Sequence, residues 1–354
     1  MAERVLMKGN EALAEAAIQA GCRHFFGYPI TPQTELAAYM SKRMPKIGGT
    51  YLQAESEIAA INMVLGAASA GVRAMTSSSS PGISLKGEGI SYIAGSDLPA
   101  LIINVQRGGP GLGGIQPSQA DYWQATKALG HGDFQILVFA PSTVQEMVDL
   151  VSDAFDLADT YRMPAMILAD GMLGQMMEPV EIRSNEHKKP IEKPWATTGH
   201  QNKRVHNVVN SLYLQPKDLE RLVRERFARY EVIKQKEQRA EEYLTEDADL
   251  VLVAYGASSR VARSAVNKAR EQGFKVGLVR PITLWPFPTD VLQKNAKTAK
   301  GFLCVEMSMG QMVDDVRLAV NGAVPVDFYG RTGGMIPSPA EILTKMKEIL
   351  GGAQ

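Results

Sequence analysis

The strongest candidate for chemistry in this sequence is a glutamate at the start of a stretch of small residues. Glu57 opens a predicted helix over residues 57–70 after a short strand, and Gly66 stands nine positions after it. The helix dipole favours a carboxylate near a helix N-terminus, and small side chains let such a helix pack closely on a neighbour. The pattern predicts either a carboxylate aimed at a ligand or a glutamate that only stabilises its own helix.

A run of hydroxyl groups follows in the segment Thr76-Ser77-Ser78-Ser79-Ser80-Pro81-Gly82-Ile83. Serine hydroxyls and freed backbone groups at a strand end can meet the polar edge of a bound ring. The alternative is a plain strand-to-helix turn with a serine N-cap. Because the segment comes directly after the helix that Glu57 opens, a binding role gains weight.

The turn Gly27-Tyr28-Pro29-Ile30-Thr31-Pro32 presents one hydroxyl between two prolines. Proline fixes the backbone angle φ, so Thr31 is expected to be held in a defined place. On these residues alone, a strand-end turn followed by proline at a helix start explains the segment better.

Arg107 is the candidate cation of the sequence, because it follows the apolar run of residues 101–106. Ligands bind at the carboxyl ends of strands in open α/β sheets, and a guanidinium can hold a carboxylate through two hydrogen bonds. The alternative is an exposed arginine in an ion pair. A glycine-rich loop follows Arg107 directly, which favours the binding role.

That loop, Gly109-Pro110-Gly111-Leu112-Gly113-Gly114, matches the G-x-G-x-x-G pattern of dinucleotide-binding proteins. The dinucleotide site requires the loop to open directly into a helix whose N-terminus holds the pyrophosphate. Pro110 lies inside the match and Pro117 follows it, so a helix can begin only later. A flexible, close-packed active-site loop is therefore favoured over a dinucleotide site.

The elements that must position these residues alternate between strand-like and helical segments. Helical stretches are predicted at 57–70 and 142–159, and strands at 24–28, 51–53, 73–77, 101–105, 135–139 and 165–169. Short strands separated by helix-length segments indicate βαβ units and a doubly wound parallel sheet. The fold class is therefore α/β.

A second α/β domain is predicted after a break in this alternation between about residues 181 and 247. A polar connector at 187–190 and 193–194 leads to one amphipathic helix, marked by Leu219, Leu222, Val223, Phe227, Tyr230 and Ile233. Strands are then predicted at 250–254, 275–279, 302–305 and 326–329. The sequence thus divides into residues 1–182, a linker over 183–247, and a smaller domain over 248–354.

The composition excludes several classes of function. The chain has 354 residues, 45% hydrophobic and 21% charged, with 38 basic and 38 acidic side chains. This balance gives no indication of binding to nucleic acid or to an anionic membrane, and no apolar run is long enough to cross a bilayer. The segment Met1-Ala2-Glu3-Arg4 carries an acid and lacks an apolar signal core, which predicts a cytoplasmic protein.

The cysteines and histidines predict no metal site on this chain. The two cysteines, Cys22 and Cys304, fit a reducing compartment, and two thiolates cannot provide the four that an iron–sulfur cluster needs. The five histidines have no metal-ligand spacing, and we expect His131, which could shuttle a proton, to be structural. Any cluster is expected on another chain.

Glu57, its spacing to Gly66 and the serine-rich segment together resemble the pyrimidine-binding domain of thiamine diphosphate enzymes. In that family one glutamate at this point hydrogen-bonds the aminopyrimidine ring and promotes ylide formation. The spacing selects Glu57 over Glu55. The resemblance implies that Glu57 is catalytic and that it binds the cofactor together with Pro29, Ser79, Ser80 and Gly82.

A closer resemblance is to the α subunit of 2-oxoacid:ferredoxin oxidoreductases, and it covers nearly the whole chain. Residues 28–32 resemble that family's Y-P-I-T-P segment, in which the threonine, here Thr31, meets the substrate carboxylate that an arginine, here Arg107, holds. Residues 305–311 resemble its V-E-M-x-x-G-Q segment. The resemblance implies a pyrimidine-binding domain over 1–182 and a transketolase C-terminal-like domain over 248–354, in which we expect Glu306 to be structural.

The resemblance also implies cofactors and partner chains. Thiamine enzymes hold the diphosphate through Mg²⁺ with a G-D-G segment, which Gly132-Asp133-Phe134 and Ala169-Asp170-Gly171 each match only in part. A partner β subunit is therefore expected to supply the diphosphate and Mg²⁺ half of the site. Iron–sulfur clusters are expected on γ and ferredoxin-like subunits, ferredoxin as the electron acceptor, and coenzyme A as the acyl acceptor.

The implied reaction is the oxidative decarboxylation of a 2-oxoacid to an acyl-coenzyme A. The loop after Arg107 is apolar and has no second cation, which favours a branched-chain acid such as 2-oxoisovalerate. The motifs also resemble the branched-chain members most closely. The alternatives are 2-oxoglutarate as substrate and, in another class of function, a non-catalytic assembly subunit, against which the presence of Thr31, Glu57 and Arg107 argues.

Overall fold

The computed structural model describes residues 4–182 and 191–351, apart from the side chain of Ala128. Two expectations concern residues outside these ranges. The first part of the polar connector, 187–190, lies outside the described residues, whereas its second part, 193–194, is described. Most of the N-terminal segment on which the predicted compartment rests also lies outside them.

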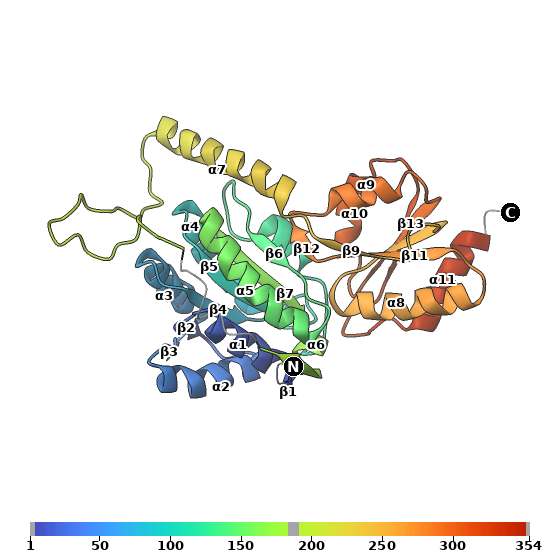
Figure 1. The fold of residues 1–354 in the computed structure, drawn as a ribbon, viewed down its shortest axis with the longest axis horizontal. Coiled ribbons are helices and arrows are strands. Elements are labelled where there is room, and N and C mark those ends of the chain that lie inside the picture. The colour runs from blue at the N-terminus through green and yellow to red at the C-terminus, as the bar shows by residue number, and fades with distance from the viewer. Residues whose placement is uncertain (1–3, 183–190, 352–354) are drawn as a thin grey trace.

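Seven strands form the first sheet, in the order β12-β6-β7-β5-β4-β2-β3 (Figure 1). All neighbouring strands are parallel except β12, which pairs antiparallel with β6. The central strand β5 is buried at every residue, as expected of a parallel sheet covered on both faces. The bounds are β2 (His24–Gly27), β3 (Thr50–Gln53), β4 (Ala74–Ser78), β5 (Ala100–Gln106), β6 (Leu137–Phe139), β7 (Pro164–Asp170) and β12 (Thr283–Trp285).

Helices cover both faces of this sheet. Helix α5 packs on α1 and lies in front of the sheet in Figure 1, whereas α4 packs on α3 and lies behind it. This arrangement confirms the doubly wound parallel sheet, and each predicted strand lies within two residues of an observed one. The bounds are α1 (Gly9–Gln19), α2 (Thr34–Arg43), α3 (Glu57–Ser69), α4 (Ser80–Gly95), α5 (Val144–Tyr161) and α6 (Gly171–Gln175).

The second sheet has the order β14-β13-β10-β11-β9, with β9 antiparallel to β11 and the other pairs parallel. Helices α8 and α11 pack on each other over one face, above an apolar cluster that includes Leu252 and Val305. The bounds are β9 (Ala240–Tyr243), β10 (Leu250–Val253), β11 (Val276–Pro281), β13 (Gly301–Glu306), β14 (Val326–Gly330), α8 (Gly256–Glu271), α9 (Thr289–Asn295), α10 (Met312–Val320) and α11 (Pro339–Gly351).

Among the strand pairings that were not predicted, those of β12 with β6 and of β1 with β8 bear on how the sheets are assembled. Strand β12 follows β11 in the chain but completes the first sheet, so the segment after residue 248 serves both sheets. Near the N-terminus, β1 (Arg4–Lys8) pairs antiparallel with β8 (Met177–Glu181). Both pairings join segments that are far apart in sequence.

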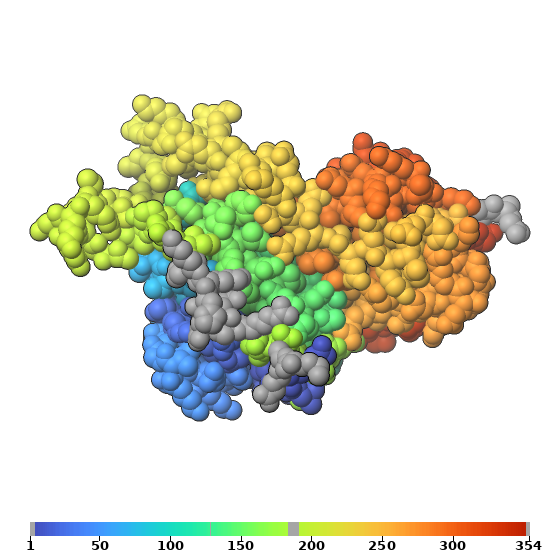
Figure 2. All heavy atoms as spheres, in the orientation of Figure 1, coloured from blue at the N-terminus to red at the C-terminus, as the bar shows by residue number. Residues whose placement is uncertain are grey.

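The segment between the two sheets contains the predicted amphipathic helix, α7 (Pro216–Lys236). Tyr230 and Ile233 are buried on its inner face, and buried Arg226 donates to Asp97 at 2.9 Å. Residues 191–215 contain no helix or strand, and in Figures 1 and 2 this yellow-green segment extends away from the rest of the molecule.

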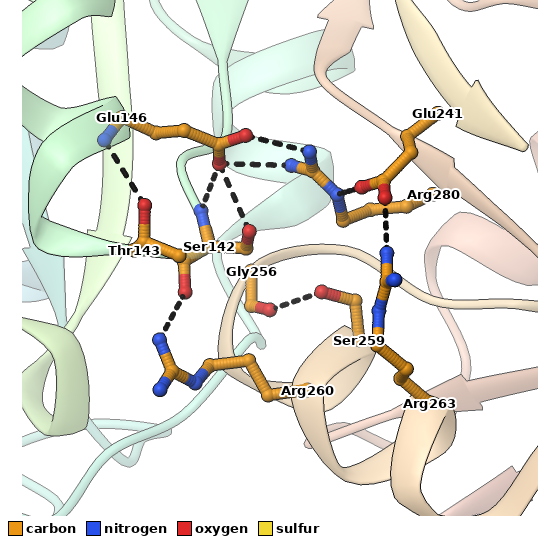
Figure 3. Close-up of polar contacts among 9 residues, drawn as sticks. All are labelled: Ser142, Thr143, Glu146, Glu241, Gly256, Ser259, Arg260, Arg263 and Arg280. Atoms are coloured by element: carbon orange, nitrogen blue, oxygen red, sulfur yellow. Dashed lines mark hydrogen bonds and ion pairs between the residues drawn. The ribbon is translucent and has the colours of Figure 1, made fainter. Parts of the chain in front are cut away.

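A network of charged side chains holds the two sheets and their helices together (Figure 3). Arg280 on β11 is 5% exposed and donates to both carboxylate oxygens of Glu146 on α5, at 2.6 and 3.0 Å. It also donates to Glu241 on β9 at 2.8 Å, and Glu241 in turn pairs with Arg263 on α8.

No described helix is long and apolar enough to span a membrane.

Candidate active site

Glu57 is the first residue of α3 and is only 6% exposed. Ser56 caps the helix, since its Oγ accepts a hydrogen bond from the backbone N–H of Ala59 at 3.2 Å. The carboxylate lies against α4 where Gly82 has no side chain, because a Cβ at position 82 would be 2.7 Å from Glu57 Oε1. Ser56 and not Glu57 caps the helix, and the Glu57 side chain lies buried between α3 and α4.

The serine-rich segment forms the end of β4 and the start of α4, as predicted. Thr76, Ser78 and Ser79 are buried, and among the described residues their hydroxyls have no hydrogen-bond partner. Ser79 is the N-cap residue of α4 but makes no side-chain cap bond, so the plain capping alternative does not explain it. Buried polar groups without partners are unfavourable. These hydroxyls therefore suit a ligand with a polar edge.

Ser80 has a different place from its neighbours, because its hydroxyl is fully engaged within the chain. It donates to Asp121 Oδ2 at 2.6 Å and accepts from the backbone N–H of Arg107 at 3.0 Å. Asn104 donates to the same Asp121 oxygen at 2.9 Å. Burial raises the pKa of Asp121, and the hydrogen bonds from Ser80 and Asn104 oppose this. The cluster fastens the start of α4 to the end of β5.

The structure brings Arg107 and Thr31 together. The guanidinium of Arg107 donates to the Thr31 carbonyl at 3.0 Å and to the Leu112 carbonyl at 3.2 Å, and its Nε has no partner among the described residues. Arg107 is 8% exposed, whereas Thr31 and Pro29 are exposed. Gln33 joins the Thr31 turn to β4 by accepting from Ser77 Oγ at 2.7 Å. The turn, the serine-rich segment and Arg107 thus meet at one edge of the sheet.

The glycine-rich loop after Arg107 does not open into a helix. It folds back on itself, with the N–H of Gly108 bonded to the carbonyl of Gln116 at 3.0 Å and that of Gly114 to the carbonyl of Gly108 at 2.9 Å. A Cβ at Gly113 would lie 1.9 Å from the Gly108 carbonyl oxygen, so this close approach requires glycine. The geometry is that of a close-packed loop and does not fit the dinucleotide pattern.

Lys86 on α4 and Asp121 were not predicted as members of this site. Lys86 is fully buried, and burial lowers its pKa to about 8 while the nearby charge of Glu57 acts in the opposite direction. The sequence did carry a signal, because Ile83, Lys86 and Ile90 recur at helical spacing on a buried face. A lysine among apolar residues on a buried helical face either destabilises the fold or serves a function.

Glu306 and Asp170 cap helices, and His131 lies at the surface. Glu306 accepts hydrogen bonds from the backbone N–H groups of Met312 and Val313, both at 3.0 Å, and so caps α10. Asp170 accepts from the N–H of Met172 at 2.9 Å and caps α6, and burial raises its pKa to about 6. His131 is exposed, with Nδ1 3.3 Å from Ser91 Oγ. The described residues include no group of three acidic, histidine or cysteine side chains that could hold a metal.

Two family profiles match this chain. Residues 15–246 match "Pyruvate flavodoxin/ferredoxin oxidoreductase, thiamine diP-bdg", and residues 248–342 match "Pyruvate:ferredoxin oxidoreductase core domain II". The chain is 50% identical over 348 residues to the ketoisovalerate oxidoreductase subunit VorB of Methanothermobacter marburgensis, covering 98% of both chains. It is 36% identical over 379 residues to the 2-oxoglutarate synthase subunit KorA of the same organism, covering 98% of this chain and 99% of that one.

A solved structure has the same fold. It is the 2-oxoglutarate:ferredoxin oxidoreductase from Magnetococcus marinus, solved with 2-oxoglutarate, coenzyme A and succinyl-CoA bound, and it matches with a TM-score of 0.89 and 28% identity over 98% of this chain. The match spans 65% of the length of the Magnetococcus chain. Since the profiles cover most of the chain and the curated relatives align over nearly all of it, the chain belongs to the 2-oxoacid:ferredoxin oxidoreductases, as an α-type subunit with a thiamine diphosphate-binding domain.

Proposed function

We propose that this chain is the thiamine-activating subunit of a coenzyme A-acylating oxidoreductase for branched-chain 2-oxoacids such as 2-oxoisovalerate. One observation carries the assignment of the site: the buried Glu57 carboxylate and the unpartnered Ser78 hydroxyl at the end of β4 lie against a glycine that leaves no room for a side chain. The 50% identity to the ketoisovalerate subunit supports the substrate class.

The residues around Glu57 fit the pyrimidine half of thiamine diphosphate. When bound, this cofactor supplies an electron sink for the decarboxylation of a 2-oxoacid. Glu57 would hold a proton between its carboxylate oxygen and a nitrogen of the pyrimidine ring, with Ser79 and Gly82 beside it and Pro29 at the neighbouring turn. The orphaned hydroxyls of Ser78 and Ser79 support this placement, because a polar ring edge would satisfy them.

Arg107 and Thr31 would bind the substrate carboxylate. Arg107 is a guanidinium with donors to spare, since two of its N–H groups bond to backbone carbonyls and Nε has no partner among the described residues. A carboxylate could therefore join it without breaking the contact that holds Thr31 nearby. Ser80 would act through its bonds to Asp121 and the Arg107 backbone, by fixing the strand end that presents the arginine.

Partner subunits would complete the site. Apolar side chains lie exposed on α3, on α4 and in the glycine-rich loop after Arg107, among them Ile58 at 49%, Leu85 at 51% and Ile115 at 59%. An exposed apolar surface next to half of a cofactor site suits a β subunit that brings the diphosphate and Mg²⁺ half. We assign the iron–sulfur clusters to γ and ferredoxin-like subunits, which would pass electrons singly to ferredoxin. We assign the complex to the cytoplasm, where the free thiols of Cys22 and Cys304 would stay reduced.

We also propose a division into domains. Residues 1–182 would form the pyrimidine-binding domain, 183–247 the linker and 248–354 a transketolase C-terminal-like domain. The profile boundaries at 246 and 248 support the second division. The division between the domains is not complete, since the later domain contributes strand β12 to the first sheet.

The test is to purify this chain with its co-purifying subunits and measure 2-oxoacid- and coenzyme A-dependent reduction of a low-potential dye. Activity in the complex and none in the isolated chain would support a shared site. Thiamine-independent activity, or none with all partners present, would instead indicate a non-catalytic assembly subunit. Competition between 2-oxoisovalerate and 2-oxoglutarate would identify the substrate, the second being the acid named for the 36% identical relative.

Glu57→Gln should lower kcat at least about 100-fold in the complex, because proton transfer by a positioned carboxylate contributes roughly that much or more. The matched control is Glu55→Gln. Glu55 is exposed and bonds only to Ser56 Oγ at 3.3 Å among the described residues, so this variant should keep its turnover. Retained turnover in Glu57→Gln would rule out the catalytic assignment.

A further inference from the structure

Lys86 is a fully buried cation that the proposed reaction does not use. It lies on α4, and its Nζ has no hydrogen-bond partner among the described residues. Ile83 and Ile90, its neighbours along the same helical face, are also completely buried. A methionine of similar length would fill this position without the penalty of an unpaired buried charge. The charge itself therefore needs an explanation.

The position of Lys86 connects it with Glu57. Lys86 follows Gly82 by one helical turn, so the two residues share a face of α4. Gly82 lies directly against the Glu57 side chain, with a Cβ position only 2.7 Å from Glu57 Oε1. Burial lowers the pKa of Lys86, and the charge of Glu57 opposes this lowering. Because no hydrogen bond joins them, the ammonium acts on the carboxylate through space.

The other charged groups near the site are engaged elsewhere. Asp121, after the glycine-rich loop, interacts with Ser80, Asn104 and the charge of Arg107. Arg107, at the end of β5, bonds to the carbonyls of Thr31 and Leu112. Glu88 on α4 is exposed and accepts from Tyr92 at 2.6 Å. Lys86 and Glu57 thus form a separate pair in the buried layer between α3 and α4.

We propose that Lys86 is a positioning residue for Glu57. The buried ammonium of Lys86 stabilises the ionised Glu57 carboxylate at the place where the thiamine pyrimidine ring binds. The inference rests on the proposed function, since it assigns a purpose to Glu57. Two opposite charges in a buried layer interact more strongly than they do in water. A nearby ammonium favours the charged form of the Glu57 carboxylate, and with it the release of a proton to a bound partner.

Four versions of the assembled complex test this role: wild type, Lys86→Met, Glu57→Gln and the double variant. Calorimetry without substrate gives the affinity for thiamine diphosphate as a function of pH. In Lys86→Met, the acidic pH at which half of the affinity is lost should rise by roughly one unit, about a tenfold weakening on that limb. In the Glu57→Gln background the same substitution should leave the pH profile unmoved. Coinciding profiles for wild type and Lys86→Met, or an equal shift without Glu57, would overturn the proposal.

Further variants separate charge from packing. Lys86→Arg keeps the charge and should retain the wild-type midpoint, and Lys86→Gln gives a second neutral side chain if the methionine variant assembles poorly. Ile90→Val, one turn further along the same buried face, should lower the melting temperature without moving the midpoint. A wild-type complex that neither binds thiamine diphosphate nor oxidises a 2-oxoacid would overturn the proposed function and this inference together. An active wild type with an unchanged Lys86→Met profile would overturn only the role of Lys86.

Discussion

At the residue scale, the site depends on the absence of a side chain at Gly82 as much as on the side chains that line it. Glu57 can lie against the backbone of α4 only because residue 82 is a glycine, since a Cβ there would be 2.1 Å from Ser78 Oγ and 2.7 Å from Glu57 Oε1. The two polar groups that Gly82 separates are the catalytic candidate and one of the unpartnered hydroxyls. A methyl group at this point would displace both.

Gly82→Ala should therefore weaken thiamine diphosphate binding and destabilise the isolated chain by about 1–3 kcal/mol, as overpacking of a filled interior does. Gly66→Ala is the matched control, because Gly66 lies in the interior of α3 and a Cβ there would meet nothing within 4 Å. In a helix interior this change should stabilise by about 0.5–1 kcal/mol. Urea unfolding of both variants measures the difference, and equal effects would contradict the packing argument.

Lys86 is also expected to make stability depend on pH. Burial lowers the pKa of Lys86 to about 8 from an ordinary value of 10.5. Between these values the unfolded chain holds a proton that the folded chain has released, so the free energy of unfolding rises with pH across this window. Lys86→Met should be more stable than wild type at neutral pH, and this advantage should shrink from about pH 8 upward. An advantage that stays constant in alkaline urea titrations would show that the lysine does not change its charge on unfolding.

From the sequence, Glu57 and Arg107 were proposed as site residues from their place in the pattern, and Thr31 through the family resemblance, whereas Lys86 was not singled out. The reason is physical. Glu57 is at the start of a helix and Arg107 directly follows the end of a strand. Such boundaries can be located from the hydrophobic pattern. Whether a lysine within a helix is buried depends on what packs against that helix, here α3, and this partner comes from elsewhere in the chain.

At the element scale, helix α3 is the part that aims Glu57, and its N-cap decides where the helix begins. Ser56 has an extended backbone and accepts from the Ala59 N–H, which fixes Glu57 as the first helical residue. The strands and helices that were predicted lie within a few residues of observed elements, because their apolar periodicity is local. The pairings of β12 with β6 and of β1 with β8 were not predicted, since each joins segments that are distant in sequence.

Ser56→Ala should destabilise the chain by about 1 kcal/mol and also lower kcat, because loss of the cap lets the first turn that carries Glu57 fray. Thr143→Ala is the control. Thr143 caps α5 in the same way, accepting from the Glu146 N–H at 3.1 Å, but it lies away from Glu57. The control should show a similar loss in thermal unfolding with turnover retained. Equal losses of turnover in the two variants would mean that general destabilisation lowers the rate, and not the displacement of Glu57 at the start of α3.

At the scale of the whole molecule, the two sheets and their helices are held as one body by apolar and charged contacts. One apolar cluster runs from α5 into β10 and β13, so the second sheet shares its inner face with the first. Gln119 is fully buried and bonds across to the Tyr255 carbonyl at 2.8 Å and to Ser258 Oγ at 2.6 Å. Arg280 adds the charged network of Figure 3. The loop that carries Arg107 is therefore supported from both sheets.

Arg280→Met should destabilise the chain by about 2–3 kcal/mol, because it leaves the Glu146 and Glu241 carboxylates without their shared guanidinium. Burial raises the pKa of Glu241, but hydrogen bonds from Arg280 and Arg263 outweigh it and hold that pKa below its ordinary value of 4.5. A depressed carboxyl pKa stabilises the fold above that value and loses its effect as pH falls, so the deficit of Arg280→Met should shrink in acid. Arg224→Met is the control, since Arg224 is 77% exposed and, among the described residues, pairs only with Glu220 along α7; its effect should stay within about 0.5 kcal/mol. Calorimetric scans at neutral and acidic pH measure both variants. A deficit that is equal at both pH values would mean that Arg280 stabilises the junction by packing rather than by charge.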